Sequence, residues 1–315
     1  MNRREAGLEP LMRSAVVGRI VHALLFVGPE GTGKRRWAEK FAQALLCRSE
    51  GDRPCGRCPA CRQVAEGVHP DLHVVEPEKG AIRVGAIREL VEALGMQPYS
   101  GGVHVALIDG ADRMNESAQN ALLKTLEAPV GEVRFLLVAR TESALLPTIR
   151  SRCQKVRFSE DTIEDCTEQL VRQGLPAPRA RMLAGLAQGA PGRAAKLDQD
   201  EHYFEVRQDV LAVLEDAAKE QGALSAQSHL VGRKDDAQLV MEQLELFARD
   251  RMALENGAEV FEQSDLNRLQ ACRMDGARML LAVREARQRL NVNVTWTGVV
   301  DGLLFALRAC ARKGA

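Results

Sequence analysis

The stretch ALLFVGPEGTGKR, residues 23–35, decides how the chain folds. The apolar residues 23–27 predict a buried strand, and a glycine-rich turn leads from them into a helical pattern. The turn matches G-x-x-x-x-G-K, in which backbone N–H groups surround a phosphate and the helix N-terminus adds partial positive charge. We therefore expect a nucleotide-binding loop formed by Gly28, Gly31, Gly33 and Lys34.

The residue after Lys34 departs from this pattern. Phosphate loops continue with Ser or Thr, whose hydroxyl ligates Mg²⁺, but this chain has Arg35. A guanidinium group carries a positive charge and has no acceptor lone pair, so it cannot ligate Mg²⁺. The loop is predicted to be able to hold a phosphate or a nucleotide, ATP or ADP, but to be poorly built for metal-assisted hydrolysis.

A second strand pattern, residues 103–108, ends in Asp109, which we expect to belong to the same nucleotide site. Working ATPases of this architecture place Glu after that Asp, where it orients the attacking water. Here the next residue is Gly110, and the carboxylate of Asp112, two residues further on, is expected to point elsewhere. With two catalytic positions empty, we predict a nucleotide-binding fold without intrinsic ATPase activity.

Short apolar runs alternate with helical patterns as far as residue 158. Further runs at 72–75, 135–139 and, more weakly, 155–158 are typical of strands buried on both faces of a parallel sheet. A helix after Asn115, its expected N-cap, is predicted to stop before Pro129. The pattern predicts an α/β domain, a parallel sheet with flanking helices.

Beyond residue 158 the strand patterns stop and helical patterns follow. A turn-rich segment near 159 and a charged segment at 197–202 predict three domains, at 1–158, 159–201 and 202–315. Thr297 is the expected cap of the last helix. One face of that helix carries Val299, Val300, Leu303, Leu304 and Leu307.

Composition limits the classes of function. The 315 residues include 43 Lys and Arg and 43 Asp and Glu, and a formal net charge of zero disfavours a wholly basic nucleic-acid binder. No run approaches the ~18 uncharged apolar residues that a membrane span needs. The N-terminus shows no signal-peptide pattern, so we expect a cytoplasmic protein. In a reducing compartment, clustered cysteines indicate a metal rather than disulfides.

Four of the eight cysteines form such a cluster, with the spacing C-x7-C-x2-C-x2-C over residues 47–61. Four thiolates suit tetrahedral Zn²⁺ and leave no open coordination position, which predicts a structural site. An iron–sulfur cluster and unmetallated cysteines are the alternatives, although the ferredoxin pattern would need a cysteine at Ala65. The predicted ligands are Cys47, Cys55, Cys58 and Cys61. Neighbouring arginines, which offer charge compensation, are Arg48, Arg53, Arg57 and Arg62.

Three sequence features of the first half occur together. The cysteine module follows the phosphate-loop helix, NALLKTLEAP occupies 120–129, and TIRSRC occupies 148–153. In combination they resemble bacterial clamp-loader subunits of the AAA+ superfamily, the gamma/tau/delta-prime family of DNA polymerase III. The resemblance covers most of residues 20–158 and continues more loosely through 189–193, 290–293 and the last apolar helix. It implies an AAA+ domain with a zinc-binding insert, a small helical lid at 159–201 and an all-α collar at 202–315.

The resemblance also implies roles for single residues. Gamma and tau keep Ser/Thr and Glu at the positions of Arg35 and Gly110, so this chain is similar to the non-motor delta-prime branch. Arg152 in S-R-C would be an arginine finger acting in trans on ATP of a neighbouring subunit, a role worth about 10³ or more in rate. Ala139 stands where active relatives have a polar sensor, and Arg193 is shifted by one residue from a second sensor position.

The implied partners are gamma/tau and delta subunits in a five-subunit, ring-like assembly. That assembly opens a sliding clamp and closes it around primed DNA, without any membrane. An apolar stripe in the last domain is consistent with subunit packing, although core packing would also produce it; its residues are Met279, Leu280, Val283 and Leu290.

Two other functions stay open at this point. An ATP-hydrolysing gamma/tau-like subunit would show Mg²⁺-dependent turnover that Lys34→Ala abolishes. A zinc-dependent DNA-binding protein would use the arginine-rich residues 47–62, but the zero net charge and the lack of stacking aromatics there weigh against it.

Overall fold

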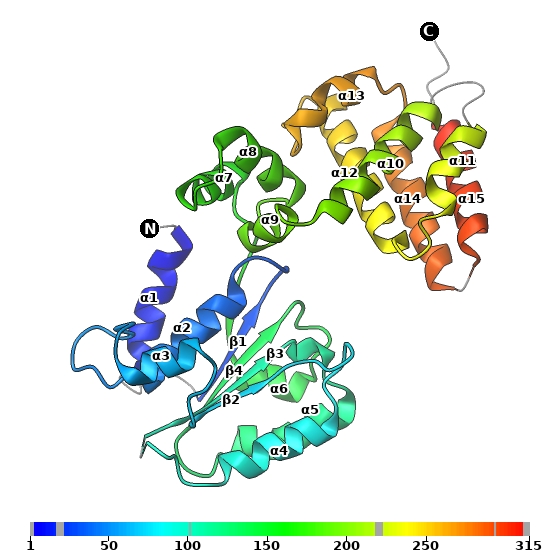
Figure 1. Ribbon diagram of the computed structural model, residues 1–315. Coiled ribbons are helices and arrows are strands. Elements are labelled where there is room, and N and C mark those ends of the chain that lie inside the picture. Colours follow the sequence, from blue (N-terminus) through cyan, green and yellow to red (C-terminus); the bar gives the residue numbers. More distant parts are fainter. Residues whose placement is uncertain (1–2, 17–21, 101, 218–222, 293, 311–315) are drawn as a thin grey trace. The chain divides into compact units, whose positions relative to one another are not determined.

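The apolar run before the glycine-rich turn forms a strand inside a parallel sheet. The computed structural model describes residues 3–16, 22–100, 102–217, 223–292 and 294–310. The strands are β1 (Ala23–Val27), β2 (Leu72–Val75), β3 (His104–Asp109), β4 (Val133–Ala139) and β5 (Gln154–Arg157). They lie in the order β2-β3-β4-β1-β5, and every neighbouring pair is parallel (Figure 1). The predicted α/β fold with a parallel sheet is confirmed.

Strand β4 begins two residues before the apolar run that predicted it. Val133 and Arg134 pair with His104 and Val105 of β3, so the ladder extends past the charged residue. Arg134 interrupts the apolar pattern, which is why the sequence alone placed the start of the strand at Phe135. The hydrogen bonds to β3 therefore determine where β4 begins.

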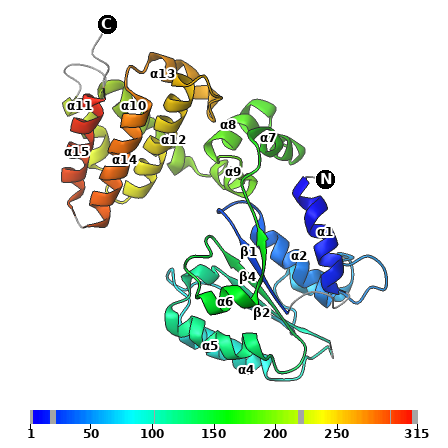
Figure 2. The ribbon, with the colours of Figure 1, turned by 180° about the vertical axis from the view of Figure 1, so that it is seen from behind.

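Helices cover both faces of the sheet. Successive strand residues point to opposite faces, so Leu25 and Phe26 of β1 belong to two different cores. On the side of Leu25 the sheet packs against α4 (Val84–Leu94), α5 (Glu116–Glu127) and α6 (Pro147–Arg152). On the side of Phe26 it packs against α1 (Arg3–Val16), α2 (Lys34–Leu46) and α3 (Pro59–Ala65), as Figures 1 and 2 show.

Helix α5 has the predicted ends. The Asn115 side chain accepts a hydrogen bond from the backbone N–H of Ala118 at 2.8 Å, which satisfies one of the unpaired donors of the first turn. The helix ends at Glu127, and Ala128 separates it from Pro129. The predicted cap and stop of this helix are confirmed.

The chain divides into two compact units, Met1–Glu160 and Asp161–Ala315. The described part of the second unit is helical: α7 (Ile163–Arg172), α8 (Ala177–Leu186), α9 (Pro191–Leu197), α10 (Glu201–Ala217), α11 (Ala223–Val231), α12 (Ala237–Glu255), η2 (Gln263–Asp265), α13 (Leu266–Ala271), α14 (Gly276–Asn291) and α15 (Trp296–Ala309). Tyr203, which follows the expected boundary at 201, is buried in the core that α7 to α9 form. The division into three domains stays a prediction.

The expected cap of the last helix is wrong. Helix α15 begins at Trp296, and the hydroxyl of Thr295 accepts from the backbone N–H of Gly298 at 3.4 Å. Thr297 lies inside the first turn and is exposed. The predicted apolar face is confirmed, since Val299, Val300, Leu303, Leu304 and Leu307 are all buried.

The apolar stripe of α14 belongs to the core of its own unit. Met279 and Val283 are buried, and Leu280 and Leu290 pack against the same cluster. The stripe therefore gives no support to packing between subunits. Of the segment 290–293, Asn293 lies outside the described residues.

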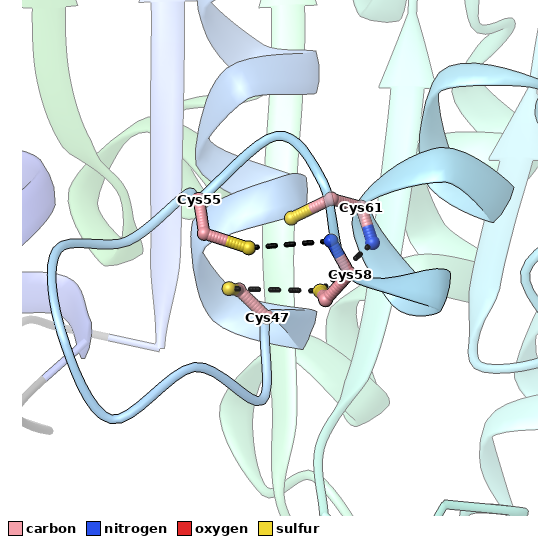
Figure 3. Close-up of side chains that lie close together, drawn as sticks. All are labelled: Cys47, Cys55, Cys58 and Cys61. Atoms are coloured by element: carbon pink, nitrogen blue, oxygen red, sulfur yellow. Dashed lines mark hydrogen bonds between the residues drawn. The ribbon is translucent and has the colours of Figure 1, made fainter.

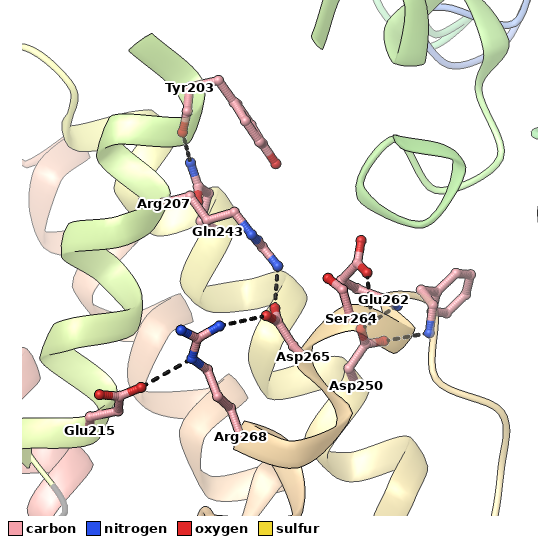
Figure 4. A network of polar contacts seen from close by, with 10 residues as sticks. Tyr203, Arg207, Glu215, Gln243, Asp250, Glu262, Ser264, Asp265 and Arg268 are labelled. Carbon is pink, nitrogen blue, oxygen red and sulfur yellow. Dashed lines mark hydrogen bonds and ion pairs between the residues drawn. The ribbon is translucent and has the colours of Figure 1, made fainter. Parts of the chain in front are cut away.

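A buried polar network joins η2 to the long helices of the second unit (Figure 4). Arg207 of α10 pairs with Asp265, and Asp250 of α12 accepts the backbone N–H groups of Phe261 and Glu262 at 3.0 and 2.9 Å. Burial raises the pKa of both Asp250 and Glu262.

Over the described residues, no helix is both long and apolar enough to cross a membrane.

Candidate functional site

The phosphate loop occupies the connection between β1 and α2, at the carboxyl edge of the sheet. The N–H of Gly28 donates to the carbonyl of Ala139 at 3.2 Å. A Cβ at Gly28 would lie 2.1 Å from the backbone oxygen of Phe158, so only glycine fits there. Gly33 is the N-cap of α2 and has φ 81°, a left-handed conformation that glycine adopts without steric cost.

The side chain of Lys34 is buried inside this loop. Its Nζ donates to the carbonyl of Pro29 at 3.0 Å, and the hydroxyl of Thr32 donates to the same oxygen at 2.9 Å. Burial lowers the pKa of Lys34, and the nearby charge of Asp109 opposes that shift. The structure thus brings the predicted lysine and the predicted Asp109 into one electrostatic environment.

Arg35 occupies the position where a phosphate loop carries its metal-binding hydroxyl. Its Nη1 contacts Asp109 Oδ2 at 2.6 Å and Glu76 Oε1 at 2.5 Å, and its Nε contacts Glu39 Oε1 at 2.7 Å. Burial alone would lower the pKa of Arg35, but hydrogen bonds to these carboxylates raise it. The carboxylate that would face Mg²⁺ is therefore paired with a guanidinium group.

Gly110 lacks a catalytic side chain, and it also has a backbone conformation that favours glycine. It has φ 71° and caps the short helix η1 (Ala111–Arg113). A Cβ there would lie 2.9 Å from Cγ of Pro77, so a glutamate would be both strained and crowded. The carboxylate of Asp112 accepts the backbone N–H of Arg140, the residue after β4, at 3.1 Å.

At the two sensor positions the chain has a buried alanine and an arginine that forms an ion pair. Ala139 is buried at the end of β4 and supplies no polar group. The next residue, Arg140, pairs with Glu30 of the phosphate loop. Arg193, at the start of α9, pairs with Glu242 of α12 inside the second unit.

The four predicted cysteines converge where the chain passes from α2 into α3 (Figure 3), and Cys61 lies in the first turn of α3. Cys47 directly follows α2, and Cys58 is the N-cap of α3, with Pro59 at the first helical position. The four sulfurs all lie within 4.8 Å of one another, and those of Cys47 and Cys58 are 3.9 Å apart. Sulfurs about 2.3 Å from a tetrahedral metal would be about 3.8 Å apart, so the cluster can hold a metal ion.

Backbone N–H groups donate hydrogen bonds to sulfurs of this cluster. The N–H of Cys58 donates to Cys55 Sγ, and the N–H of Cys61 donates to Cys58 Sγ, both at 3.4 Å. Hydrogen bonds from the backbone of Arg57 and Cys58 lower the pKa of Cys55 to about 6, while burial raises that of Cys61 to about 12. Donors that stabilise thiolates suit a metal-binding cluster.

Two of the four arginines around the cluster have side-chain partners outside it. Arg48 donates to the carbonyl of Ser100 at 3.1 Å, and Arg53 donates to that of Ser49 at 2.6 Å. Arg57 and Arg62 are exposed. These bonds shape the loop around the cysteines, and backbone N–H groups, those of Arg48 and Gly56 included, are donors that reach sulfur.

Arg152 lies at the carboxyl end of α6. Its Nη1 donates to the carbonyl of Thr148 at 2.9 Å, and its Nη2 pairs with Glu127 Oε1 at 2.6 Å. About a third of the side chain, 35%, is exposed. The guanidinium group is thus at the surface of its unit, where the carboxylate of Glu127 at the end of α5 and the carbonyl of Thr148 restrain it.

A buried glutamine positions the helix that carries Arg152. Gln119 of α5 donates to the carbonyls of Met114 and Ala144, and its Oε1 accepts the N–H of Leu146 at 2.7 Å. Leu146 is the N-cap of α6, so Gln119 fixes where that helix begins. Neither Gln119 nor Glu127 stood out in the sequence as a candidate site residue. The only available signal was that Gln119 shares a helical face with apolar residues.

Several known proteins match most of this chain in sequence. A family model described as DNA polymerase III, delta subunit, matches residues 4–162. The chain is 32% identical over 253 residues to the delta-prime subunit of DNA polymerase III from Yersinia pestis, covering 78% of this chain and 74% of that protein. It is 29% identical over 310 residues to the Bacillus subtilis delta-prime subunit, covering 95% and 94%.

A solved structure supports the fold. The gamma subunit-related protein of DNA polymerase III from Thermotoga maritima aligns with a TM-score of 0.50 and 16% identity, covering 97% of this chain and 99% of that one. At this identity the likeness concerns the arrangement of helices and strands alone.

Proposed function

Because the chain belongs to the delta-prime family of DNA polymerase III clamp-loader subunits, we propose that it helps to load the sliding clamp onto primed DNA without hydrolysing ATP itself. One observation carries the second half of this proposal. Arg35 contacts Asp109 at 2.6 Å, so the carboxylate expected to serve Mg²⁺ already has a cationic partner. The partners we propose are the gamma/tau and delta subunits and, through the complex, the clamp and primed DNA.

Within the complex, we propose that Arg152 supplies an arginine finger in trans. It lies at a helix end on the surface of its unit, and an exposed ion pair such as that with Glu127 is worth only about 0–1 kcal/mol, so it opposes release weakly. A released guanidinium can stabilise the charge that develops on a transferred phosphoryl group. The chain then assists hydrolysis in a neighbouring subunit while its own loop performs none.

For the cysteine cluster, we propose a structural Zn²⁺ ion held by Cys47, Cys55, Cys58 and Cys61. Four thiolates complete a tetrahedral shell, so no position is left for a reacting water. The cluster connects the end of α2 to the start of α3, and both helices pack on the same face of the sheet. The ion would fix the loop of residues 47–58, which contains little other regular structure.

The trans role is tested by reconstituting the chain with active gamma/tau and delta subunits. Arg152→Ala should slow hydrolysis at the neighbouring site about 10³-fold, seen as loss of a fast phase in single-turnover assays with primed DNA. Arg152→Lys keeps the charge without the forked geometry and should restore little of this rate. The complex should assemble in both cases.

Arg157→Ala is the matched control, because Arg157 is an exposed arginine of the same unit and contacts only Glu142 among the ion pairs of the described residues. It should leave turnover unchanged. Unchanged turnover in Arg152→Ala would remove Arg152 from the mechanism. The purified chain alone should show no Mg²⁺-dependent ATPase activity, and activity that Lys34→Ala abolishes would instead make it an ATP-hydrolysing subunit.

A further inference from the structure

The phosphate loop of this fold implies a magnesium ion, and the residues present do not fit one. Mg²⁺ needs an oxygen ligand at position 35 and a free carboxylate at Asp109. Position 35 is an arginine, whose guanidinium group can only donate, and its Nη1 lies 2.6 Å from Asp109 Oδ2. The metal position and its carboxylate are both taken by protein atoms.

Three separate elements supply carboxylates to this one guanidinium group. Asp109 ends β3, Glu76 follows β2, and Glu39 lies one turn along α2 from Arg35. Asp109 and Glu76 share the same nitrogen, Nη1. Without a cation between them these carboxylates would repel one another, and carboxylate oxygens are the ligands that hard divalent cations prefer. Arg35 therefore fills the electrostatic role of a metal with a charge that never dissociates.

One nitrogen of the Arg35 guanidinium group, Nη2, is available to bind a ligand. Nε and Nη1 donate to carboxylates, whereas Nη2 has no hydrogen-bond or ion-pair partner among the residues that the structure describes. The side chain as a whole is 39% exposed, so the site is open to solvent. Guanidinium N–H groups are good donors to phosphate oxygens. Lys34 is its neighbour in sequence, and both residues lie in the first turn of α2, which follows the phosphate loop.

We propose that Arg35 permanently replaces the magnesium ion of this phosphate loop, so that the loop binds the polyphosphate of a nucleotide in its metal-free form. The carboxylates of Asp109 and Glu76 orient Arg35, and Nη2 and Lys34 contact the phosphates. The inference concerns only the chain's own loop and does not depend on the role of Arg152.

The test measures binding of ADP and of ATP to the full chain by titration calorimetry, once with EDTA and once with excess Mg²⁺. The unmodified chain should bind equally well or better in EDTA, because Mg²⁺ sequesters the free nucleotide. Arg35→Thr restores a hydroxyl and frees three carboxylates. The affinity of this variant for nucleotide should therefore be higher by about tenfold or more with Mg²⁺ than without it.

Arg36→Thr is the matched control, since Arg36 is the exposed neighbour on the same helix and the change removes the same charge. It should keep the metal independence of the unmodified chain. Lys34→Ala should abolish binding in both buffers, which places the nucleotide in this loop.

A second measurement does not need nucleotide. Added Mg²⁺ or Mn²⁺ should raise the melting temperature of Arg35→Thr, because the freed carboxylates can bind the ion, and should leave the unmodified chain and Arg36→Thr unchanged. The proposal is overturned if the unmodified chain binds neither nucleotide, if it binds only with Mg²⁺, or if Arg35→Thr gains no response to either metal. Assembly with gamma/tau and delta subunits, measured by co-purification, reports separately on the proposed function.

Discussion

At the scale of single residues, two arginines of the first unit form ion pairs that bear on the proposed function. Arg35 pairs with Asp109 inside the phosphate loop, and Arg152 pairs with Glu127 at the surface. Both contacts neutralise a guanidinium group with a carboxylate, but they differ in number. Among the described residues Arg35 pairs with three carboxylates, whereas Arg152 pairs with one and donates to the carbonyl of Thr148, so Arg152 is the more easily released of the two.

The contact between Glu127 and Arg152 leads to a prediction for the assembled complex. Glu127→Gln removes the charge that restrains Arg152, and turnover at the neighbouring site should rise, by no more than about fivefold, because an exposed ion pair contributes about 1 kcal/mol or less. The measurement is steady-state ATP turnover of the complex with primed DNA. The double variant Glu127→Gln with Arg152→Ala should be as slow as Arg152→Ala alone. A rise that persists in the double variant would show that Glu127 acts through another group.

At the scale of the elements, N-cap residues and tertiary packing determine where helices begin. Asn115 caps α5 as the sequence predicts, but α15 uses Thr295 in place of Thr297. Two threonines separated by one residue offer the same local signal, and packing of Trp296 into the core decides between them. The indole Nε1 of Trp296 donates to the carbonyl of Leu230 at 2.8 Å, which places Trp296 at the first position of the helix.

The cap of α15 can be tested with a matched pair of variants. Thr295→Ala removes the hydroxyl that accepts from Gly298, and the free energy of unfolding should fall by about 1 kcal/mol. Thr297→Ala changes an exposed residue of the first turn and should alter it by less than about 0.5 kcal/mol. Urea denaturation followed by circular dichroism measures both. Equal losses would mean that the hydroxyl of Thr295 is not the cap.

The cysteine module is a second element whose stability can be measured. We expect about one Zn²⁺ per chain after gentle purification, and removal of the ion should lower the melting temperature, because the ion stabilises the folded loop only. Cys58→Ser should lose the metal. Cys272→Ser, a cysteine of the second unit outside the cluster, should keep it. A metal content far below one per chain in the unmodified protein would count against the site.

At the scale of the whole molecule, the chain forms two compact units, each with its own buried cores. In the second unit, α7 to α9 and the longer helices are joined by close contacts. A Cβ at Gly185 of α8 would lie 2.2 Å from the carbonyl oxygen of Phe261, and Arg249 of α12 contacts Gln188. Burial of Tyr203 among α7 to α9 adds to this connection.

These contacts predict how fragments of the second unit behave. Residues 161–315 should fold alone and unfold in one cooperative transition. Residues 202–315 should be less stable by about 3 kcal/mol or more, because Tyr203 loses the residues that bury it. Urea denaturation of the two fragments tests this. Equal stabilities would support separate domains on either side of residue 201.

Much of this protein could be predicted from local patterns. The strands and the helix after the phosphate loop follow from contiguous apolar runs and from periodicity, which the sequence displays directly. The cysteine cluster follows from short spacing, because a loop of a few residues brings the sulfurs together in almost any fold. The departure of Arg35 from the phosphate-loop pattern was also visible in the sequence, since it depends on the chemistry of one side chain.

Only the tertiary structure decided which charges meet. Glu76 and Asp109 lie 41 and 74 positions from Arg35 in the chain, and they reach it because parallel strands bring their carboxyl ends to one edge of the sheet. Glu127 reaches Arg152 because Gln119 sets the start of α6. Ion pairs between distant segments leave no periodic signal, because a charged residue looks the same in sequence whether it faces solvent or a partner.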